Sequence, residues 1–366
     1  MLGSNCKGYT MSTTRTYDMI PLLKKFVVNT SKDKRRMPSG QKMTKGTKQN
    51  YQLLLERFLE FKELTQFDLK VYSLTSSNKR AYNQARLYHQ KLYDSFTEFL
   101  YTQRGLFDNS VGNNIKQLKV FYKWLNINEG IFTGDFYKNF YVWKEEIPII
   151  VLNSEQLTFL IYDEEFHNSL IGRISRAKDI FVFGCTVALR VSDLLKLRKS
   201  NIETIGATTY LRTISQKTGT YTKIKLPPYA IDIVKRNNSK GVHLFSPIGA
   251  GNLNLCIKAI AERAGWTYEY PKIRTRRGKQ VVIINNPYTK IPYRFCDLLS
   301  SHTMRRTAIT TMLNLGVEER NVRKISGHAP GSKEFFKYVK YSQEKIDVDL
   351  DNMYDKLAEK RLHSSN

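Results

Sequence analysis

Cysteine is scarce in this chain. Only four cysteines occur among its 366 residues, and they form no CxxC pair and have no histidine partners at zinc-ligand spacing. They are Cys6, Cys185, Cys256 and Cys296. This pattern argues against a disulfide framework and against a structural metal, so we expect a protein of a reducing compartment that needs no metal.

Long apolar segments are missing as well. No apolar run reaches the ~18–20 residues that a membrane-spanning helix needs. The N-terminus has no apolar stretch of the signal-peptide kind. We therefore expect a soluble, cytoplasmic protein without a membrane partner.

Acidic residues are strongly outnumbered. Asp and Glu number 33 against 59 Lys and Arg, which gives a formal charge of +26. Both halves contribute, with 24 − 13 = +11 over residues 1–150 and 35 − 20 = +15 over residues 151–366. Apolar residues make up 41% of the chain, which excludes a wholly disordered polycation. Two basic domains that grip one polyanion fit best, and nucleic acid is the first candidate.

Helical periodicity predicts an all-helical first domain over residues 18–132, after an unstructured N-terminus at 1–17. Its last helix is predicted from about residue 110 to 126, and two stripes follow it. The apolar stripe consists of Ile115, Leu118, Tyr122 and Leu125. The basic stripe consists of Lys116, Lys119 and Lys123. A lysine stripe suits a DNA backbone but is also typical of a solvated face, and the basic charge of this half favours DNA.

Aromatics and turns interrupt the helical pattern over residues 133–152, where we place a linker. A mixed domain is predicted over residues 153–343. It contains two strands joined by a turn at 217–220, a basic hairpin or loop at 272–279, and helices from about residue 302 onward. Residues 344–366 are predicted to form an amphipathic C-terminal helix and tail. The fold class is therefore mainly α with a small β component.

Three segments of the second domain contain candidate catalytic groups. In the first, Ser192 is expected to cap a helix, with Asp193 at its positive end and Arg190 just outside. In the second, Ser301 is expected to cap a helix that presents His302 and Arg305 on one turn. An isolated Arg190 is more typical of a surface ion pair, and a HxxR pair is common in so basic a chain.

The third segment is Gly327-His328, followed ten residues later by Tyr338. His328 is predicted just past a helix C-terminus, which favours its protonated form. On a helix through this segment Tyr338 borders the buried stripe marked by Phe335, whereas Tyr341 lies almost opposite it. A nucleophile should border the core, so Tyr338 is favoured over Tyr341.

Taken in order, these segments resemble the tyrosine recombinase (phage integrase) family. The resemblance rests on Arg190, a hairpin lysine at Lys217, the HxxR pair at 302–305, Gly327-His328 and Tyr338. The motifs Ser-His-Thr-x-Arg-Arg-Thr and Ile-Ser-Gly-His look closest to those of integrases of Bacteroidetes mobile elements. The resemblance covers roughly residues 18–350, and it implies a helical core-binding (SAM-like) domain and a catalytic domain that form a C-shaped clamp on DNA.

The resemblance also implies roles for individual residues. Arg190 and Arg305 would neutralise the phosphate, and Tyr338 would attack it to form a 3′-phosphotyrosyl ester. His302 would handle the tyrosine proton, and Lys217 would protonate the departing 5′ oxygen. His328 would donate a further hydrogen bond to the phosphate, and Asp193 would orient Arg190. Arg306, next to the HxxR pair, is a further candidate DNA contact, and no cofactor is implied.

The implied partners follow from the same family. They are double-stranded DNA, other copies of the chain in a tetramer that forms on DNA from free monomers, and accessory DNA-bending or directionality proteins. The terminal helix would dock on a neighbouring protomer, although it could instead fold back on its own domain. A bacterial or phage-encoded protein associated with the nucleoid is expected.

The sequence departs from the family pattern in two places. The spacing from His328 to Tyr338 is ten residues where nine is usual, which is why Tyr341 stays open as an alternative nucleophile. The first domain starts near Asp18, which leaves little room for the N-terminal arm-binding domain of many integrases. Two other functions also stay open: a type IB topoisomerase-like enzyme, and a non-catalytic DNA-binding relic of the family.

Overall fold

The computed structural model divides the chain into two compact units. Unit 1 comprises residues 1–147 and 273–282, and unit 2 comprises residues 148–272 and 283–366. The structure describes residues 15–37, 39–74, 79–216, 219–237, 241–329, 331–340, 350–351 and 353–354. The fold is mainly helical with small antiparallel sheets, in agreement with the fold class predicted from the sequence.

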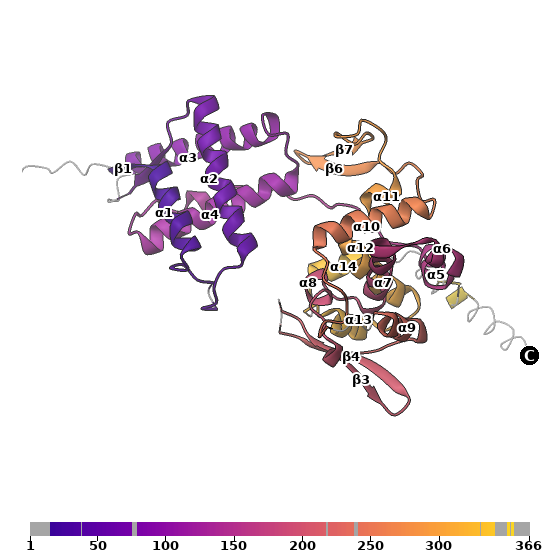
Figure 1. The fold of residues 1–366 in the computed structure, drawn as a ribbon. Helices are drawn as coiled ribbons and strands as arrows, with labels where there is room; N and C mark the ends of the chain where they lie inside the picture. The colour runs from indigo at the N-terminus through magenta and orange to yellow at the C-terminus, as the bar shows by residue number, and fades with distance from the viewer. Residues whose placement is uncertain are drawn as a thin grey trace, which may run out of the picture. The chain divides into compact units, whose positions relative to one another are not determined.

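Helices and a short antiparallel sheet build the framework of unit 1 (Figure 1). The helices are α1 (Met19–Ser31), α2 (Lys45–Thr65), α3 (Lys79–Thr102) and α4 (Asp108–Asn128). Strands β1 (Arg15–Asp18) and β2 (Lys70–Ser73) pair in antiparallel register, with Arg15 opposite Ser73. Residues 15–17, which the sequence pattern left unstructured, therefore gain order by pairing with a strand distant in sequence.

The core of unit 1 is aromatic. Phe58 and Phe96 stack with ring centroids 4.0 Å apart, and Phe26 meets Tyr51 and Phe121 edge-on. All four residues of the predicted apolar stripe on α4 are fully buried, which confirms that face of the helix. Burial of such large rings supplies most of the hydrophobic free energy of a helical domain.

The segment expected to be a linker packs into unit 1 over most of its length. Phe136 and Tyr137 belong to a 3₁₀ turn, η1 (Phe136–Asn139), and both are buried in the aromatic core with Phe140. The unit boundary falls at residues 147 and 148. Aromatic side chains in an otherwise turn-rich stretch explain the difference, because burying them outweighs the lack of regular structure.

A β-hairpin that lies between two helices of unit 2 in the sequence belongs to unit 1 in space. It consists of β6 (Lys272–Arg276) and β7 (Lys279–Ile283), in the basic stretch where a hairpin or loop was predicted. Buried Asp108 accepts hydrogen bonds from the amide nitrogens of Arg277 (2.7 Å) and Gly278 (2.9 Å) at the turn. The hairpin is thus anchored by carboxylate-to-backbone bonds rather than by a large apolar face.

A second buried carboxylate, that of Glu145, binds the same hairpin by hydrogen bonds. Glu145 accepts two hydrogen bonds from Arg274, from Nη2 at 2.6 Å and from Nε at 3.0 Å, and one from the amide of Thr275 at 2.7 Å. Although burial opposes ionisation, Arg274 and the amides of Thr275 and Asn109 hold the pKa of Glu145 below its ordinary value. Arg274 also lies over the ring of Phe107, 4.4 Å from the centroid.

Unit 2 combines helices with a three-stranded antiparallel sheet of order β3-β4-β5 (Figure 1). The strands are β3 (Ile202–Ile205), β4 (Thr208–Ile214) and β5 (Tyr221–Lys225). The sequence pattern indicated β4 and β5 but missed β3, a short edge strand with two exposed residues. The helices before the sheet are α5 (Ser154–Tyr162), α6 (Glu164–Ser169), α7 (Gly172–Val187) and α8 (Val191–Leu194), and the 3₁₀ turn η2 (Lys199–Asn201) precedes β3.

The remaining helices of unit 2 follow the sheet. They are α9 (Pro228–Arg236), α10 (Ala250–Arg263), α11 (Phe295–Leu298), α12 (Ser301–Asn314), α13 (Glu319–Ser326) and α14 (Lys333–Lys340). Helices α7 and α12 pack closely because Gly184 has no side chain: a Cβ there would lie 2.5 Å from the sulfur of Met304. Among the described residues, no helix is long and apolar enough to cross a membrane.

We expect Asp108→Asn to lower the free energy of unfolding of the chain by about 1–3 kcal/mol. The amide would place an N–H group where the carboxylate accepts two backbone N–H groups and the Tyr101 hydroxyl. Hydrogen exchange at Arg277 and Gly278 should accelerate with it. Asp94→Asn, an exposed change on α3 that removes the same charge, is the control. Unchanged exchange in the hairpin would contradict this anchoring.

Candidate active site

The loop after α7 positions the first arginine. Helix α7 ends at Ala188, which adopts the left-handed conformation (φ 54°), and Arg190 follows in extended backbone as the residue before α8. Ser192 lies inside this short helix, so its predicted capping role is wrong. The backbone reversal at Ala188 starts the next helix two residues earlier than the pattern suggested, and Asp193 still lies in its first turn.

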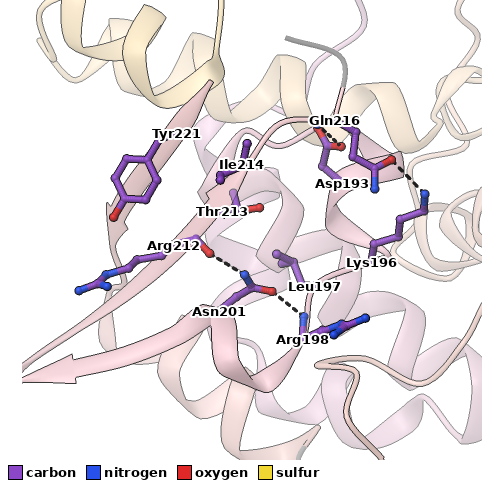
Figure 2. Close-up of a pocket in the computed structure, with 10 residues that line it drawn as sticks. All are labelled: Asp193, Lys196, Leu197, Arg198, Asn201, Arg212, Thr213, Ile214, Gln216 and Tyr221. Carbon is purple, nitrogen blue, oxygen red and sulfur yellow. Dashed lines mark hydrogen bonds between the residues drawn. The ribbon is translucent and has the colours of Figure 1, made fainter. Parts of the chain in front are cut away.

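Arg190 reaches Asp193 through a hydroxyl group. Its Nη1 donates to Oγ of Ser215 at 2.9 Å, and Ser215 Oγ donates to Oδ2 of Asp193 at 3.2 Å. The other carboxylate oxygen accepts the amide of Gln216 at 3.3 Å, as Figure 2 shows. Asp193 and Ser215 are both buried. The predicted supporting carboxylate is thus present, with a serine between it and the arginine.

Ser215 and Gln216 begin the turn between β4 and β5. The amide of Gly219 donates to the carbonyl of Ser215 (2.8 Å), and the amide of Ser215 donates to the carbonyl of Thr220 (2.9 Å). Gly219 has a φ of +66°, so the conformational freedom expected of it is used. Lys217, the predicted proton donor of this turn, lies outside the described residues.

Helix α12 carries the second arginine. The helix is capped by Ser300 in a capping box with Thr303, one residue before the predicted cap Ser301. Arg305 is 7% exposed and donates to the carbonyl of Ala188 (2.8 Å). Burial, together with the charge of Arg190, lowers the pKa of Arg305 to about 10. The left-handed turn that aims Arg190 therefore also supplies an acceptor for Arg305.

His302 lies on the same helix in an exposed position. Partial desolvation, and then the charges of Arg306 and Arg305, lower its pKa. A neutral imidazole at neutral pH is the form that accepts a proton. A lowered pKa is compatible with the role of base that the family resemblance implies for His302, which stays a prediction.

His328 follows α13, whose last residue is Ser326, and Gly327 ends the helix in the left-handed conformation. Its Nε2 lies 3.2 Å from Arg305 Nη2, and its Nδ1 lies 2.8 Å from Ser326 Oγ. Burial, then Arg305 and Arg190, lower the pKa of His328 to about 4. The prediction that the helix C-terminus favours protonated His328 is wrong, because burial beside arginines outweighs the helix dipole.

Arg305 is a donor only, and its Nη2 lies 3.2 Å from Nε2 and 3.4 Å from Nδ1 of His328, so the neutral ring acts as its acceptor. Ser326 Oγ donates to the carbonyl of Val322 (2.6 Å) and is free to accept a proton from Nδ1. His328 therefore holds the Arg305 guanidinium as an acceptor in this state.

Tyr338, on α14, borders the same cluster. Its ring centroid lies 5.8 Å from that of His328 and 6.2 Å from that of Phe335, which is fully buried. Its side chain also interacts with Arg305, and that interaction opposes the fall in the arginine pKa. Phe335 thus anchors α14 so that Tyr338 lies at the edge of the core, as its helical position predicts. Tyr341 lies outside the described residues.

Unit 2 therefore brings together five of the predicted site residues: Arg190, Asp193, Arg305, His328 and Tyr338. The site has two guanidinium groups beside one phenol and a single supporting carboxylate, an arrangement suited to binding a phosphate anion. No group of three or more histidine, cysteine or carboxylate side chains that could hold a metal occurs among the described residues.

The predicted lysine stripe lies in unit 1. Lys116 and Lys123 are exposed on α4. Lys119 instead donates to the carbonyls of Lys138 (2.6 Å) and Phe140 (3.0 Å), and partial burial lowers its pKa. Its ammonium group thus serves as a cap for the η1 segment, a role that the stripe pattern gave no means to detect. Arg306 of unit 2 is half-buried.

Residues that the sequence reasoning missed lie around Asp193. A pocket of about 430 Å³ opens beside it (Figure 2). Three cations line this pocket: Lys196, Arg198 and Arg212. Lys196 donates to Gln216 at 2.9 Å. Nothing in the local sequence indicated that Ser215 contacts Arg190 and Asp193.

Comparison with solved structures identifies the fold. The chain is similar to a lambda integrase dimer bound to a COC′ core site, with a TM-score of 0.58, 13% identity, and coverage of 89% of this chain and 77% of that one. It is also similar to the Tn1549 transposon integrase in complex with circular intermediate DNA, with a TM-score of 0.52, 16% identity, and coverage of 87% and 94%. The chain thus shares the fold of these integrases.

A third similar structure is a lambda integrase tetramer bound to a Holliday junction, with a TM-score of 0.55, 14% identity, and coverage of 88% of this chain and 79% of that one. No protein-family model matches the sequence, and no curated protein matches it by sequence. The similarity therefore lies in the fold.

We expect the imidazole of His328 to titrate near pH 4, well below the ordinary value of about 6.5. Because the folded pKa is depressed, folding stability should fall as the pH drops from about 6.5 toward 4, where the unfolded chain binds the extra proton. NMR titration of ring-labelled histidine measures this pKa, and His328→Gln assigns the signal. The variant should also show a shallower loss of stability over that window. A midpoint at or above 6.5 would contradict the burial argument.

Proposed function

We propose that the chain is a site-specific DNA recombinase that cleaves and rejoins DNA strands through a 3′-phosphotyrosyl intermediate. The observation that carries the proposal is the convergence of Arg190, Arg305, His328 and Tyr338 in one unit, although they are separated by up to 148 residues in the sequence. The fold shared with integrases supports it.

The arginines make the attack feasible. A phosphodiester is anionic and repels a second anion, and a free tyrosine has a pKa of about 10. Arg190 and Arg305 neutralise the charge that grows on the non-bridging oxygens and lower the cost of the phenolate. Tyr338 Oη then forms a bond to phosphorus while the bond to the 5′ oxygen breaks. The ester conserves the bond energy, so a 5′ hydroxyl from another duplex can reverse the step without ATP.

Two protons must move. Exposed His302, kept neutral by its surroundings, accepts the tyrosine proton, and Lys217 delivers one to the departing 5′ oxygen. His328 is neutral without substrate. A bound phosphate would raise its pKa and let Nε2 donate to the anion in place of accepting from Arg305.

The biological role and assembly are proposals at a finer level. We infer an integrase of a mobile element, of the kind that the motifs resemble in Bacteroidetes, which binds double-stranded DNA and assembles into tetramers on it. A lambda integrase tetramer among the similar structures supports this assembly. Of the terminal segment expected to pass between protomers, the described Leu350, Met353 and Tyr354 are exposed. An exposed apolar group is what a helix that docks on a neighbour requires.

We expect Tyr338→Phe to bind DNA like the wild type and to form no covalent adduct, because it lacks the attacking oxygen. The substrate is a nicked duplex selected from a randomised pool by wild-type binding, and the adduct is detected by denaturing electrophoresis. Mass measurement of the nucleotide-bearing peptide identifies the tyrosine. Tyr341→Phe is the matched control and should form the adduct.

The alternatives predict different outcomes. Adduct formation by Tyr338→Phe and its loss in Tyr341→Phe would move the nucleophile to Tyr341. Relaxation of supercoiled DNA without recombinant product would favour a type IB topoisomerase-like enzyme. Binding without any adduct by the wild type would mark a non-catalytic relic. Cleavage should withstand EDTA, because no step of the proposed mechanism uses a metal.

We expect Lys116→Ala with Lys123→Ala to weaken non-specific duplex binding and to reduce the slope of log K against log salt by about 2, since each phosphate contact contributes about 0.9. Lys119 is left intact because it caps two carbonyls. The control changes two other exposed lysines of the same unit, Lys62 and Lys91. If the salt slope fell equally in both variants, the effect would come from net charge alone. If it did not fall in the Lys116 and Lys123 variant, these lysines would be solvated and make no phosphate contact.

A further inference from the structure

Ser215 occupies a position between the first arginine and its supporting carboxylate. Among the described residues, Arg190 and Asp193 make no direct ion pair. The hydroxyl of Ser215 links them instead, at 2.9 Å from Arg190 Nη1 and 3.2 Å from Asp193 Oδ2. Ser215 is 7% exposed and Asp193 is 5% exposed, so water does not readily replace either contact.

The direction of this chain of hydrogen bonds is set by chemistry. A guanidinium only donates and a carboxylate only accepts, so the single hydroxyl proton of Ser215 points to Asp193 while its lone pair receives Arg190. Hydrogen bonds aligned in this way polarise and strengthen one another. The hydroxyl thus transmits the negative charge of Asp193 to the guanidinium and restricts its rotation.

The same carboxylate also holds the base of the β4–β5 turn. Asp193 Oδ1 accepts the amide of Gln216, the residue before Lys217, while Oδ2 accepts Ser215 (Figure 2 shows the Gln216 contact). The amide and carbonyl of Ser215 close that turn by bonding to Thr220 and Gly219. Ser215 therefore contacts the guanidinium of Arg190 and also closes the start of the β4–β5 turn.

We propose that Ser215 is a positioning residue of the reaction, which aligns Arg190 with the scissile phosphate and couples that arginine to the start of the β4–β5 turn. The inference rests on the proposed function, because it assigns Ser215 a role in the same site. It goes beyond the motifs, none of which includes this serine. A structural role alone would predict a loss of stability with no specific effect on the chemical step.

The test compares single-turnover adduct formation by Ser215→Ala, Ser215→Thr and wild type on the selected nicked duplex. Ser215→Ala should bind DNA normally and cleave about 10-fold more slowly or worse, the loss typical when a partner that orients a ligating group is removed. Ser215→Thr retains the hydroxyl and should cleave near the wild-type rate. Ser169→Ala, the same chemical change on α6, is the matched control and should leave cleavage unchanged.

Two further measurements separate positioning from folding. If Ser215 acts through Arg190, adding Ser215→Ala to Arg190→Ala should cause no further loss. On a substrate with a methylphosphonate at the scissile position, which is neutral and needs less charge stabilisation, the penalty of Ser215→Ala should shrink. A defect of folding would persist on both substrates.

The outcomes distinguish the two proposals. A wild-type protein that forms no adduct overturns the proposed function and, with it, the catalytic role of Ser215. A wild-type protein that forms the adduct while Ser215→Ala cleaves at the same rate overturns only the role of Ser215. The role of Ser215 is also overturned if the loss of cleavage rate in Ser215→Ala adds to that of Arg190→Ala, or if it is the same on the methylphosphonate substrate.

Discussion

The site depends on burying the guanidinium of Arg305, which forms no direct ion pair with any carboxylate that the structure describes. A buried cation loses its hydration, and this chain compensates with neutral acceptors, the carbonyl of Ala188 and the imidazole of His328. A carboxylate would satisfy Arg305 in the resting state and leave little attraction for a phosphate. Neutral partners keep the charge available, and the lowered pKa of both Arg305 and His328 reflects this imbalance.

Arg190 is treated differently. It is half-buried and linked to Asp193, but through a hydroxyl rather than directly, so the carboxylate orients it without fully neutralising it. The two arginines therefore differ in their partners. The charge of buried Arg305 is only partly compensated, by neutral acceptors, whereas Arg190 is oriented by Ser215 at the start of the β4–β5 turn. Ala188 precedes Arg190 by two residues and accepts a hydrogen bond from Arg305, so a shift of the backbone at Ala188 would move both groups together.

The packing of the surrounding helices holds this cluster in place. Gly184 lets α12 approach α7, which brings Arg305 to the end of α7. Phe335, fully buried beside Ile309 and Val322, holds α14 so that Tyr338 faces the ring of His328. In unit 1 the same reliance on buried carboxylates recurs, since Asp108 and Glu145 hold a hairpin that comes from a distant part of the sequence.

The sequence by itself determined the fold class and the apolar stripe of α4, for which periodicity suffices because both depend on local geometry. The site residues came from the resemblance to a known family, and their roles stay predictions. Contacts between segments far apart in sequence are different. They made residues 15–17 a strand, turned the expected linker into core, assigned the hairpin at 273–282 to unit 1 and made Lys119 a cap. Only tertiary structure set the protonation of His328 and placed Ser215 between Arg190 and Asp193, because burial and neighbouring charges arise from packing and carry no local signature in the sequence.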